Sequence, residues 1–453
     1  MKKSYWMLLC CLVWPLFLWM QFGGVIPYLD SGIDFLQAYD FYSGGLPALI
    51  SHWASLHPPF KMTVVSILFF LFGSSSRAYA LFGLLLGWIA SCAYFVIVTK
   101  TIKSFWMIAG MMMIFLLYPL GVAGTIGGFT DYALFTWCLV AWAGYISNNT
   151  VVVFIASLCA VLTKEPGVFL PASLIIAELI QPTAIKRKIQ WKFLISLAFT
   201  PVALFIWVGI LSWYGKGAWS DHILAVGHFS NGMIASLQNI SSGGWNNPYA
   251  FQNMLHVFVM NFQWVYWLVA IVGILLALFF CSKRPKHHPG EALLPAAIFA
   301  FLYIVFVLSF PTYAIPRYVL PVSASLLVFL LYSLRGYWFV HISLSVVCWL
   351  IVCGVSVMGL FFSIDPVSLG IWKTLTLENQ TLYNMRDERA GNDGITYNIQ
   401  EALLVKSRTK QIQQGLLQTR DCYQWKLYDP RNDKRIFSLF GVRPGHTFID
   451  CLR

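Results

Sequence analysis

The sequence predicts a mainly α-helical, polytopic membrane protein, and three observations support this fold class. Of the 453 residues, 58% are hydrophobic and only 11% are charged, and the mean hydropathy is +0.70. Several apolar runs reach the roughly 20 residues that a helix needs to cross a hydrocarbon core. The basic residues lie mostly in short segments between those runs, as in the cytosolic loops of membrane proteins. The net charge of +12 therefore indicates a membrane orientation and not binding to nucleic acid.

Residues 1–362 form the predicted membrane module, a helical bundle with twelve apolar runs. The runs are 5–27, 62–73, 78–99, 104–120, 131–147, 150–163, 166–181, 193–214, 255–281, 292–311, 316–334 and 337–362. We interpret the first as a retained helix, because it is long for the apolar core of a signal peptide and lacks a clear cleavage site. The second is about a dozen residues long, which is typical of a re-entrant or interfacial helix. We therefore expect about eleven crossings.

The distribution of Lys and Arg residues predicts which side of the membrane each loop faces. If 62–73 does not cross and the N-terminus is cytosolic, twelve Lys and Arg residues of the module are cytosolic and five lie outside. If 62–73 crosses, the later clusters move outside and the bias reverses. We therefore expect an integral protein of the plasma membrane (the inner membrane of a bacterium), with the N-terminus in the cytosol and the C-terminus outside.

The acidic residues then fall mostly on the outer side. The module has eight carboxylates, and only Glu178 and Glu291 are expected on the cytosolic side. The other six are Asp30, Asp34, Asp40, Asp131, Glu165 and Asp221. Two large outer segments, 28–77 and 215–254, are expected on the same side. Acids contribute little to topology, so their clustering is independent evidence that any chemistry lies on the outer face.

Residues 363–453 form a polar C-terminal region with thirteen Lys or Arg and ten Asp or Glu residues. The periodicity predicts a helix over 398–418 and two short strands within 425–441, hence a small α+β soluble region. Its place outside the membrane suggests acceptor binding or a lid. Cys422 and Cys451 lie in this region and could pair if it faces an oxidising compartment.

Asp34 and Asp40 are candidate catalytic bases in the first outer segment. A carboxylate near a low-dielectric boundary tends to be paired or functional, and one held at the membrane surface could take a proton from an acceptor. The alternative is a solvated loop, in which Asp30 or Asp34 caps a short helix that begins near Phe35.

Cations and aromatic residues suggest a phosphate site. Lys164 precedes Glu165 at the outer end of a helix, where it could hold a phosphate or simply snorkel to the interface. Arg317 opposes the charge bias and its guanidinium suits phosphate, whereas Tyr318 also reads as an interfacial anchor. His57 is a weaker phosphate candidate, since a loop histidine is more often only solvated.

The sequence has no Walker A, GxGxxG, CxxC or HExxH motif. No cofactor is expected to be required. A divalent metal is not predicted, although a pair such as Asp34 and His57 leaves that alternative open.

The order of these motifs resembles the GT-C superfamily of integral membrane glycosyltransferases, in the branch related to protein O-mannosyltransferases and aminoarabinose transferases. The matching pieces are DFLQAYDFYSGG with Asp34 and Tyr39, then HPP at 57–59, TDYALF with Asp131, TKEPGVFLP with Lys164, and PRYVLP with Arg317. The resemblance covers about residues 5–335.

The resemblance implies transfer of a sugar from a polyprenyl-phosphate-linked donor to a glycan, lipid or protein acceptor on the non-cytosolic face, with inversion at the anomeric carbon. Asp34 would be the base, and Lys164, Arg317 and His57 would hold the departing phosphate. Asp131 and Glu165 would organise the site. Several relatives have a second acid directly after the first, where this chain has Phe35, so the base is either Asp34 or Asp40.

Two other classes of protein remain as alternatives. A transporter or flippase of lipid-linked sugars would bury polar groups near mid-membrane in paired repeats, and this chain shows no internal repeat. A non-catalytic partner that kept a GT-C fold would retain the architecture without the chemistry.

Overall fold

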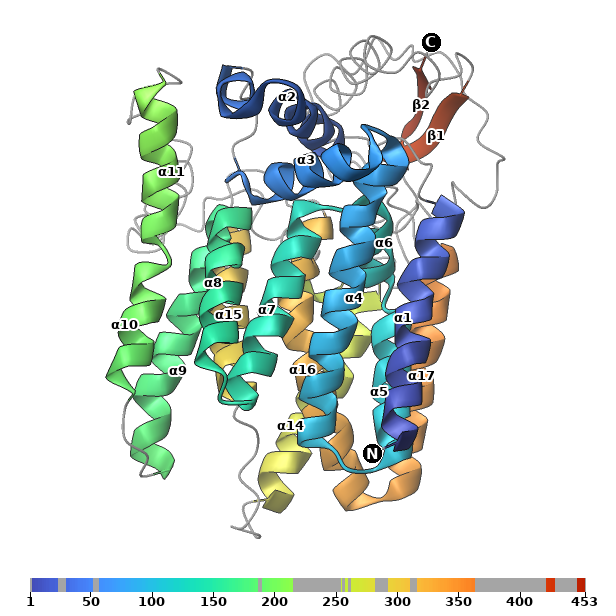
Figure 1. The fold of residues 1–453 in the computed structure, drawn as a ribbon. Coiled ribbons are helices and arrows are strands. Elements are labelled where there is room, and N and C mark those ends of the chain that lie inside the picture. Colours follow the sequence, from blue (N-terminus) through green and yellow to red (C-terminus); the bar gives the residue numbers. More distant parts are fainter. Residues whose placement is uncertain are drawn as a thin grey trace, which may run out of the picture.

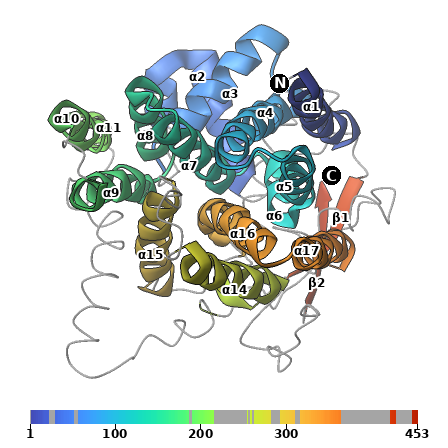
Figure 2. The ribbon, with the colours of Figure 1, turned by 90° about the horizontal axis from the view of Figure 1, so that it is seen from below.

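The computed structural model describes residues 2–22, 30–51, 57–185, 190–214, 254, 257–259, 262–281, 292–309, 316–362, 421–427 and 446–452. Most of the described helices run side by side as a bundle, while α2 and α3 lie across one end of it (Figure 1). In the view along the bundle, α16 lies among α7, α14, α15 and α17 (Figure 2), and it packs against all four.

Apart from α2, which lies in the predicted outer segment 28–77, the described helices overlap the predicted apolar runs. They are α1 (Lys2–Phe22), α2 (Asp30–Ser51), α3 (Phe60–Phe72), α4 (Ser76–Thr101), α5 (Phe105–Leu117), α6 (Pro119–Gly127), α7 (Thr130–Ile146), α8 (Thr150–Thr163), α9 (Phe169–Ile185), α10 (Trp191–Phe199), α11 (Val202–Trp213), α14 (Gln263–Cys281), α15 (Leu293–Ser309), α16 (Leu320–Val340) and α17 (Ile342–Phe362). Two short 3-10 helices, η1 (Glu165–Val168) and η3 (Pro316–Val319), precede α9 and α16.

Three described helical stretches are long and apolar enough to cross a membrane: 77–101, 191–213 and 342–360. The pair α5 and α6 adds a fourth if it is one broken span, bent by 54° where Tyr118 is followed by Pro119. Proline cannot donate the next helical hydrogen bond, which explains the break. Several other apolar helices are shorter, so the eleven crossings stay a prediction.

The first outer segment is more ordered than expected. Residues 30–51 form α2, with a break at Gly45, whose φ of 66° suits glycine. The solvated loop with a short helix near Phe35 is therefore wrong, because Phe35 and Ala38 pack into the core at helical spacing. The interfacial run 62–73 is α3, which lies across the bundle and not along it (Figure 1).

Two antiparallel strands are described in the C-terminal region: β1 (Asp421–Leu427) and β2 (His446–Leu452). The predicted strand pair within 425–441 overlaps β1 only at its start, and β2 lies further along the chain. The register places Cys422 directly opposite Cys451. The predicted helix at 398–418 and the outer segment 215–253 lie outside the described residues.

Candidate active site

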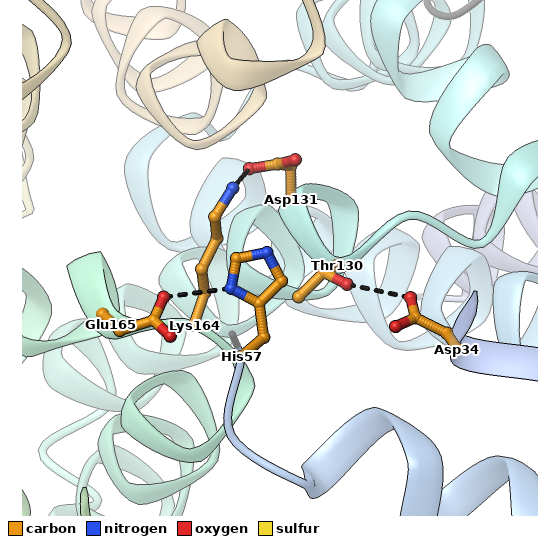
Figure 3. A network of polar contacts seen from close by, with 6 residues as sticks. All are labelled: Asp34, His57, Thr130, Asp131, Lys164 and Glu165. Carbon is orange, nitrogen blue, oxygen red and sulfur yellow. Dashed lines mark hydrogen bonds and ion pairs between the residues drawn. The ribbon is translucent and has the colours of Figure 1, made fainter. Parts of the chain in front are cut away.

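Short stretches from four parts of the chain converge where α2 and α3 lie over the bundle. They are α2, the turn 57–61 that leads into α3, the first turn of α7, and the turn after α8. Figure 3 shows six of their side chains in one network: Asp34, His57, Thr130, Asp131, Lys164 and Glu165. Residues that touch in this cluster are far apart in the sequence, as His57 and Glu165 are, at a separation of 108 positions. The fold therefore assembles a polar cluster from dispersed positions.

The first ion pair joins Lys61 to Asp34. Lys61 Nζ lies 2.5 Å from Asp34 Oδ2, and the two residues are only 1% and 2% exposed. Thr130 Oγ1 donates to the same oxygen at 3.4 Å, and the Lys61 ammonium lies 5.3 Å from the Tyr79 ring centre. No described residue donates a hydrogen bond to the other oxygen, Oδ1. Lys61 and Thr130 thus fix the position of one carboxylate oxygen of Asp34.

The second ion pair joins Lys164 to Asp131. Lys164 Nζ donates to Asp131 Oδ1 at 2.5 Å, and both residues are buried. Lys164 caps the C-terminus of α8 with an extended backbone, and Asp131 lies in the first turn of α7, where the helix dipole favours an anion. The Lys164 ammonium also lies 4.4 Å from the centre of the Tyr318 ring. Lys164 is therefore positioned by an anion and an aromatic face.

The third pair, His57 and Glu165, is the more open one. His57 Nδ1 lies 3.0 Å from Glu165 Oε2, and the side chains are 26% and 16% exposed. Glu165 follows Lys164 directly, and His57 lies four residues before Lys61, in the turn that leads into α3. Because Thr130 and Asp131 are also neighbours, the three pairs are connected through short pieces of backbone. Displacing one member is expected to disturb the others.

Both lysines are charged at neutral pH. Burial lowers the pKa of Lys61, but the Asp34 carboxylate and Tyr79 outweigh burial and raise the pKa above its ordinary value. Burial likewise lowers the pKa of Lys164, and Asp131, Tyr318 and Glu165 together raise it above the ordinary value. Two ammonium groups thus stand beside carboxylates where water is largely excluded.

Of the other predicted site residues, Tyr39 and Asp40 share α2 with Asp34, and Arg317 lies in η3. Asp40 is buried on α2, and the partly buried Tyr39 packs near Tyr42, with ring centres 5.9 Å apart. The backbone of Arg317 lies in η3, directly before the Tyr318 that contacts Lys164, while the Arg317 side chain is outside the described residues. Among the described residues, no group of three or more His, Cys, Asp or Glu side chains could hold a metal ion.

Lys61 and Thr130 belong to the cluster, although the sequence analysis did not single them out. Lys61 had a detectable signal, since it is a lone cation at the start of the apolar helix FKMTVVSILFF on the predicted outer side, against the charge bias. Thr130 had none, because a threonine before an acid at a helix start is an ordinary feature of such termini.

Comparisons with known proteins concern the fold only. No family model and no curated protein matches the chain. Two solved structures that match are crystal structures of ArnT from Cupriavidus metallidurans. The apo state is 17% identical with a TM-score of 0.44, and covers 74% of this chain and 60% of ArnT. The state bound to undecaprenyl phosphate is 18% identical with a TM-score of 0.43. This match covers 80% of this chain and 66% of ArnT. ArnT is an aminoarabinose transferase of the GT-C superfamily, which the motifs of this chain resemble. The chain spans less than two thirds of ArnT.

Proposed function

We propose that the chain is a glycosyltransferase that moves a sugar from a polyprenyl-phosphate-linked donor to an acceptor on the non-cytosolic face of the membrane. The observation that carries this proposal is the connected cluster in which two buried ammonium groups, of Lys61 and Lys164, are paired with the buried carboxylates of Asp34 and Asp131. Such a cluster offers both a proton acceptor and cationic stabilisation of a departing anion.

The proposed chemistry is a single inverting displacement. The acceptor oxygen attacks the anomeric carbon, and the bond from that carbon to the phosphate oxygen breaks. The acceptor proton passes to Asp34 Oδ1, because Lys61 and Thr130 hold Oδ2. The phosphate keeps the electron pair of the broken bond.

Lys164 and Arg317 stabilise the phosphate in this proposal. Lys164 is preorganised by Asp131 and Tyr318, and Arg317 adjoins Tyr318 in the chain. A preorganised cation stabilises developing charge without having to reorient during the reaction. Because the Asp131 carboxylate already compensates Lys164, a donor phosphate shares that lysine with Asp131, and Arg317 supplies the additional positive charge.

The experiment that tests this function is mass spectrometry of cell-envelope glycans and lipid-linked sugars, with and without the gene. Loss of the enzyme is expected to remove one glycan modification and to accumulate its polyprenyl-phosphate sugar on the non-cytosolic side. Accumulation confined to the cytosolic side would instead identify a flippase, and an unchanged profile would identify a non-catalytic partner.

A further inference from the structure

A second polar site lies at the end of the bundle opposite the candidate active site. α7 runs away from Asp131 to Tyr145, roughly 21 Å along the helix axis at 1.5 Å per residue. There Tyr145 OH donates to Glu178 Oε2 at 3.2 Å. Glu178 is 1% exposed, and its other oxygen, Oε1, has no hydrogen-bond partner among the described residues. A buried carboxylate oxygen without a donor is costly, so a ligand that donates hydrogen bonds is expected there.

A small pocket adjoins this carboxylate. It has a volume of about 20 Å³, and Glu178, Tyr145, Phe193, Asn148 and Gln190 are among the residues that line it. A volume of this size holds roughly one or two water-sized groups. The rings of Tyr145 and Phe193 lie 6.3 Å apart, centre to centre, so aromatic surface flanks the carboxylate. An anion beside aromatic rings is suited to a compact cation.

The residues next to the pocket indicate that it lies at the level of the lipid headgroups. Gln190 is followed by Trp191, which is 63% exposed, and by the exposed Lys192, at the start of a stretch that is long and apolar enough to cross a membrane. Exposed tryptophan at the end of a span is typical of the membrane–water interface. Lys192 places a positive charge close in sequence to the pocket-lining Gln190, which suits a phosphate group.

We propose that this pocket binds the primary ammonium group of an ethanolamine phospholipid, with Glu178 Oε1 accepting from the ammonium and Lys192 near the lipid phosphate. The ammonium is a water-sized donor of charge-assisted hydrogen bonds. The trimethylammonium group of choline is larger and has no N–H group, so the site discriminates between two headgroups of equal charge. The lipid fixes the ends of α7, α9 and α10 relative to the membrane.

The test uses the full chain in mixed vesicles that contain phosphatidylethanolamine and phosphatidylcholine, followed by native mass spectrometry. The wild-type protein is expected to retain one phosphatidylethanolamine in preference to phosphatidylcholine. Glu178→Gln is expected to weaken that retention at least about tenfold, as for the loss of a charge-assisted hydrogen bond. Gln190→Arg is a second variant that leaves the buried carboxylate intact but offers a competing cation, and it is expected to have the same effect.

Lys103→Gln is the matched control, because it removes an exposed charge just after the end of α4 and outside the pocket lining, so retention of the ethanolamine lipid is expected to persist. Equal retention of both lipids, or retention that is unchanged in Glu178→Gln and Gln190→Arg, would overturn the proposal. A further experiment compares the stability of the protein in pure phosphatidylcholine vesicles with sodium chloride and with choline chloride. Stabilisation by sodium that depends on Glu178, without selectivity for the ethanolamine lipid, would reassign the pocket to an inorganic cation.

Discussion

Lys61 and Asp34 come from different helices lying across the bundle, and their side chains meet at 2.5 Å in an almost completely buried ion pair. The pair fixes one oxygen of the proposed base and links α2 to α3. We therefore expect the stability of this end of the molecule and the proposed chemistry to depend on the same contact.

Lys61→Met is expected to destabilise the protein by about 3–5 kcal/mol, because it leaves the Asp34 carboxylate buried without its cation. The double variant Lys61→Met with Asp34→Asn is expected to recover part of this loss, since neither charge then remains. Thermal unfolding in lipid nanodiscs measures both. If the free energy of unfolding of Lys61→Met lies within about 0.5 kcal/mol of the wild-type value, the ion pair is not buried.

The pH dependence of this pair follows from the raised pKa of Lys61. A group whose pKa is higher in the folded state stabilises fully below its unfolded pKa, 10.5 for this lysine, and loses that contribution as pH rises through the folded value. The difference in Tm between wild type and Lys61→Met is therefore expected to stay constant from about pH 6 to about pH 9 and to shrink above about pH 10.5. A difference that already shrinks on going from pH 6 to pH 9 would show that the ammonium is not held by Asp34.

Lys164→Met is expected to lower transfer about 100-fold or more, the usual cost of removing one group that stabilises developing charge. Unpairing Asp131 could reduce activity through folding alone, so the decisive variant also carries Asp131→Asn. If Lys164 binds the phosphate, this double variant regains stability but not transfer, as measured by the glycan product and the accumulated lipid-linked sugar. Recovery of transfer would mean that Lys164 has only a structural role.

Gly167 holds the Lys164–Glu165 turn against α8. A Cβ atom at Gly167 would lie 2.1 Å from the backbone oxygen of Ala160, so Gly167→Ala must displace the turn. The expected cost is about 1–3 kcal/mol with a loss of transfer. Gly354→Ala is the matched control, since nothing lies within 4 Å of a Cβ there. Equal behaviour of the two variants in unfolding and transfer assays would show that the turn is not constrained.

Cys422 and Cys451 test the predicted side of the C-terminal region. They are opposed in the β1–β2 register, and a disulfide forms by exchange with a disulfide oxidant only in an oxidising compartment. A maleimide-linked polymer reacts only with free thiols. The unreduced protein is therefore expected to carry two fewer polymers than the reduced protein, because the disulfide blocks both cysteines. Cys422→Ser is the control, and it is expected to label equally before and after reduction because it cannot form this disulfide. Equal labelling of the wild-type protein would place the region in the cytosol or leave the cysteines unpaired.

The sequence could predict the helices because apolar length and proline positions are local properties. It could also single out Asp34, Asp131, Lys164 and Glu165 as candidates, since charges in apolar surroundings are few. It could not show that Asp34 meets Lys61 while Asp131 meets Lys164, because the pairing depends on how α2 and α3 cross the bundle. The helical state of 30–51 was missed because acids and glycines resemble a loop, whereas tertiary burial of Phe35 and Ala38 decides the conformation.

The proposed base is tested most directly by complementing a strain that lacks the gene with Asp34→Asn and, separately, with Asp40→Asn. The amount of glycan product and of lipid-linked sugar is compared at equal protein level. Asp34→Asn is expected to abolish the product and accumulate the donor, while Asp40→Asn keeps most of the product. Undiminished product from Asp34→Asn would contradict the proposal that this carboxylate accepts the acceptor proton.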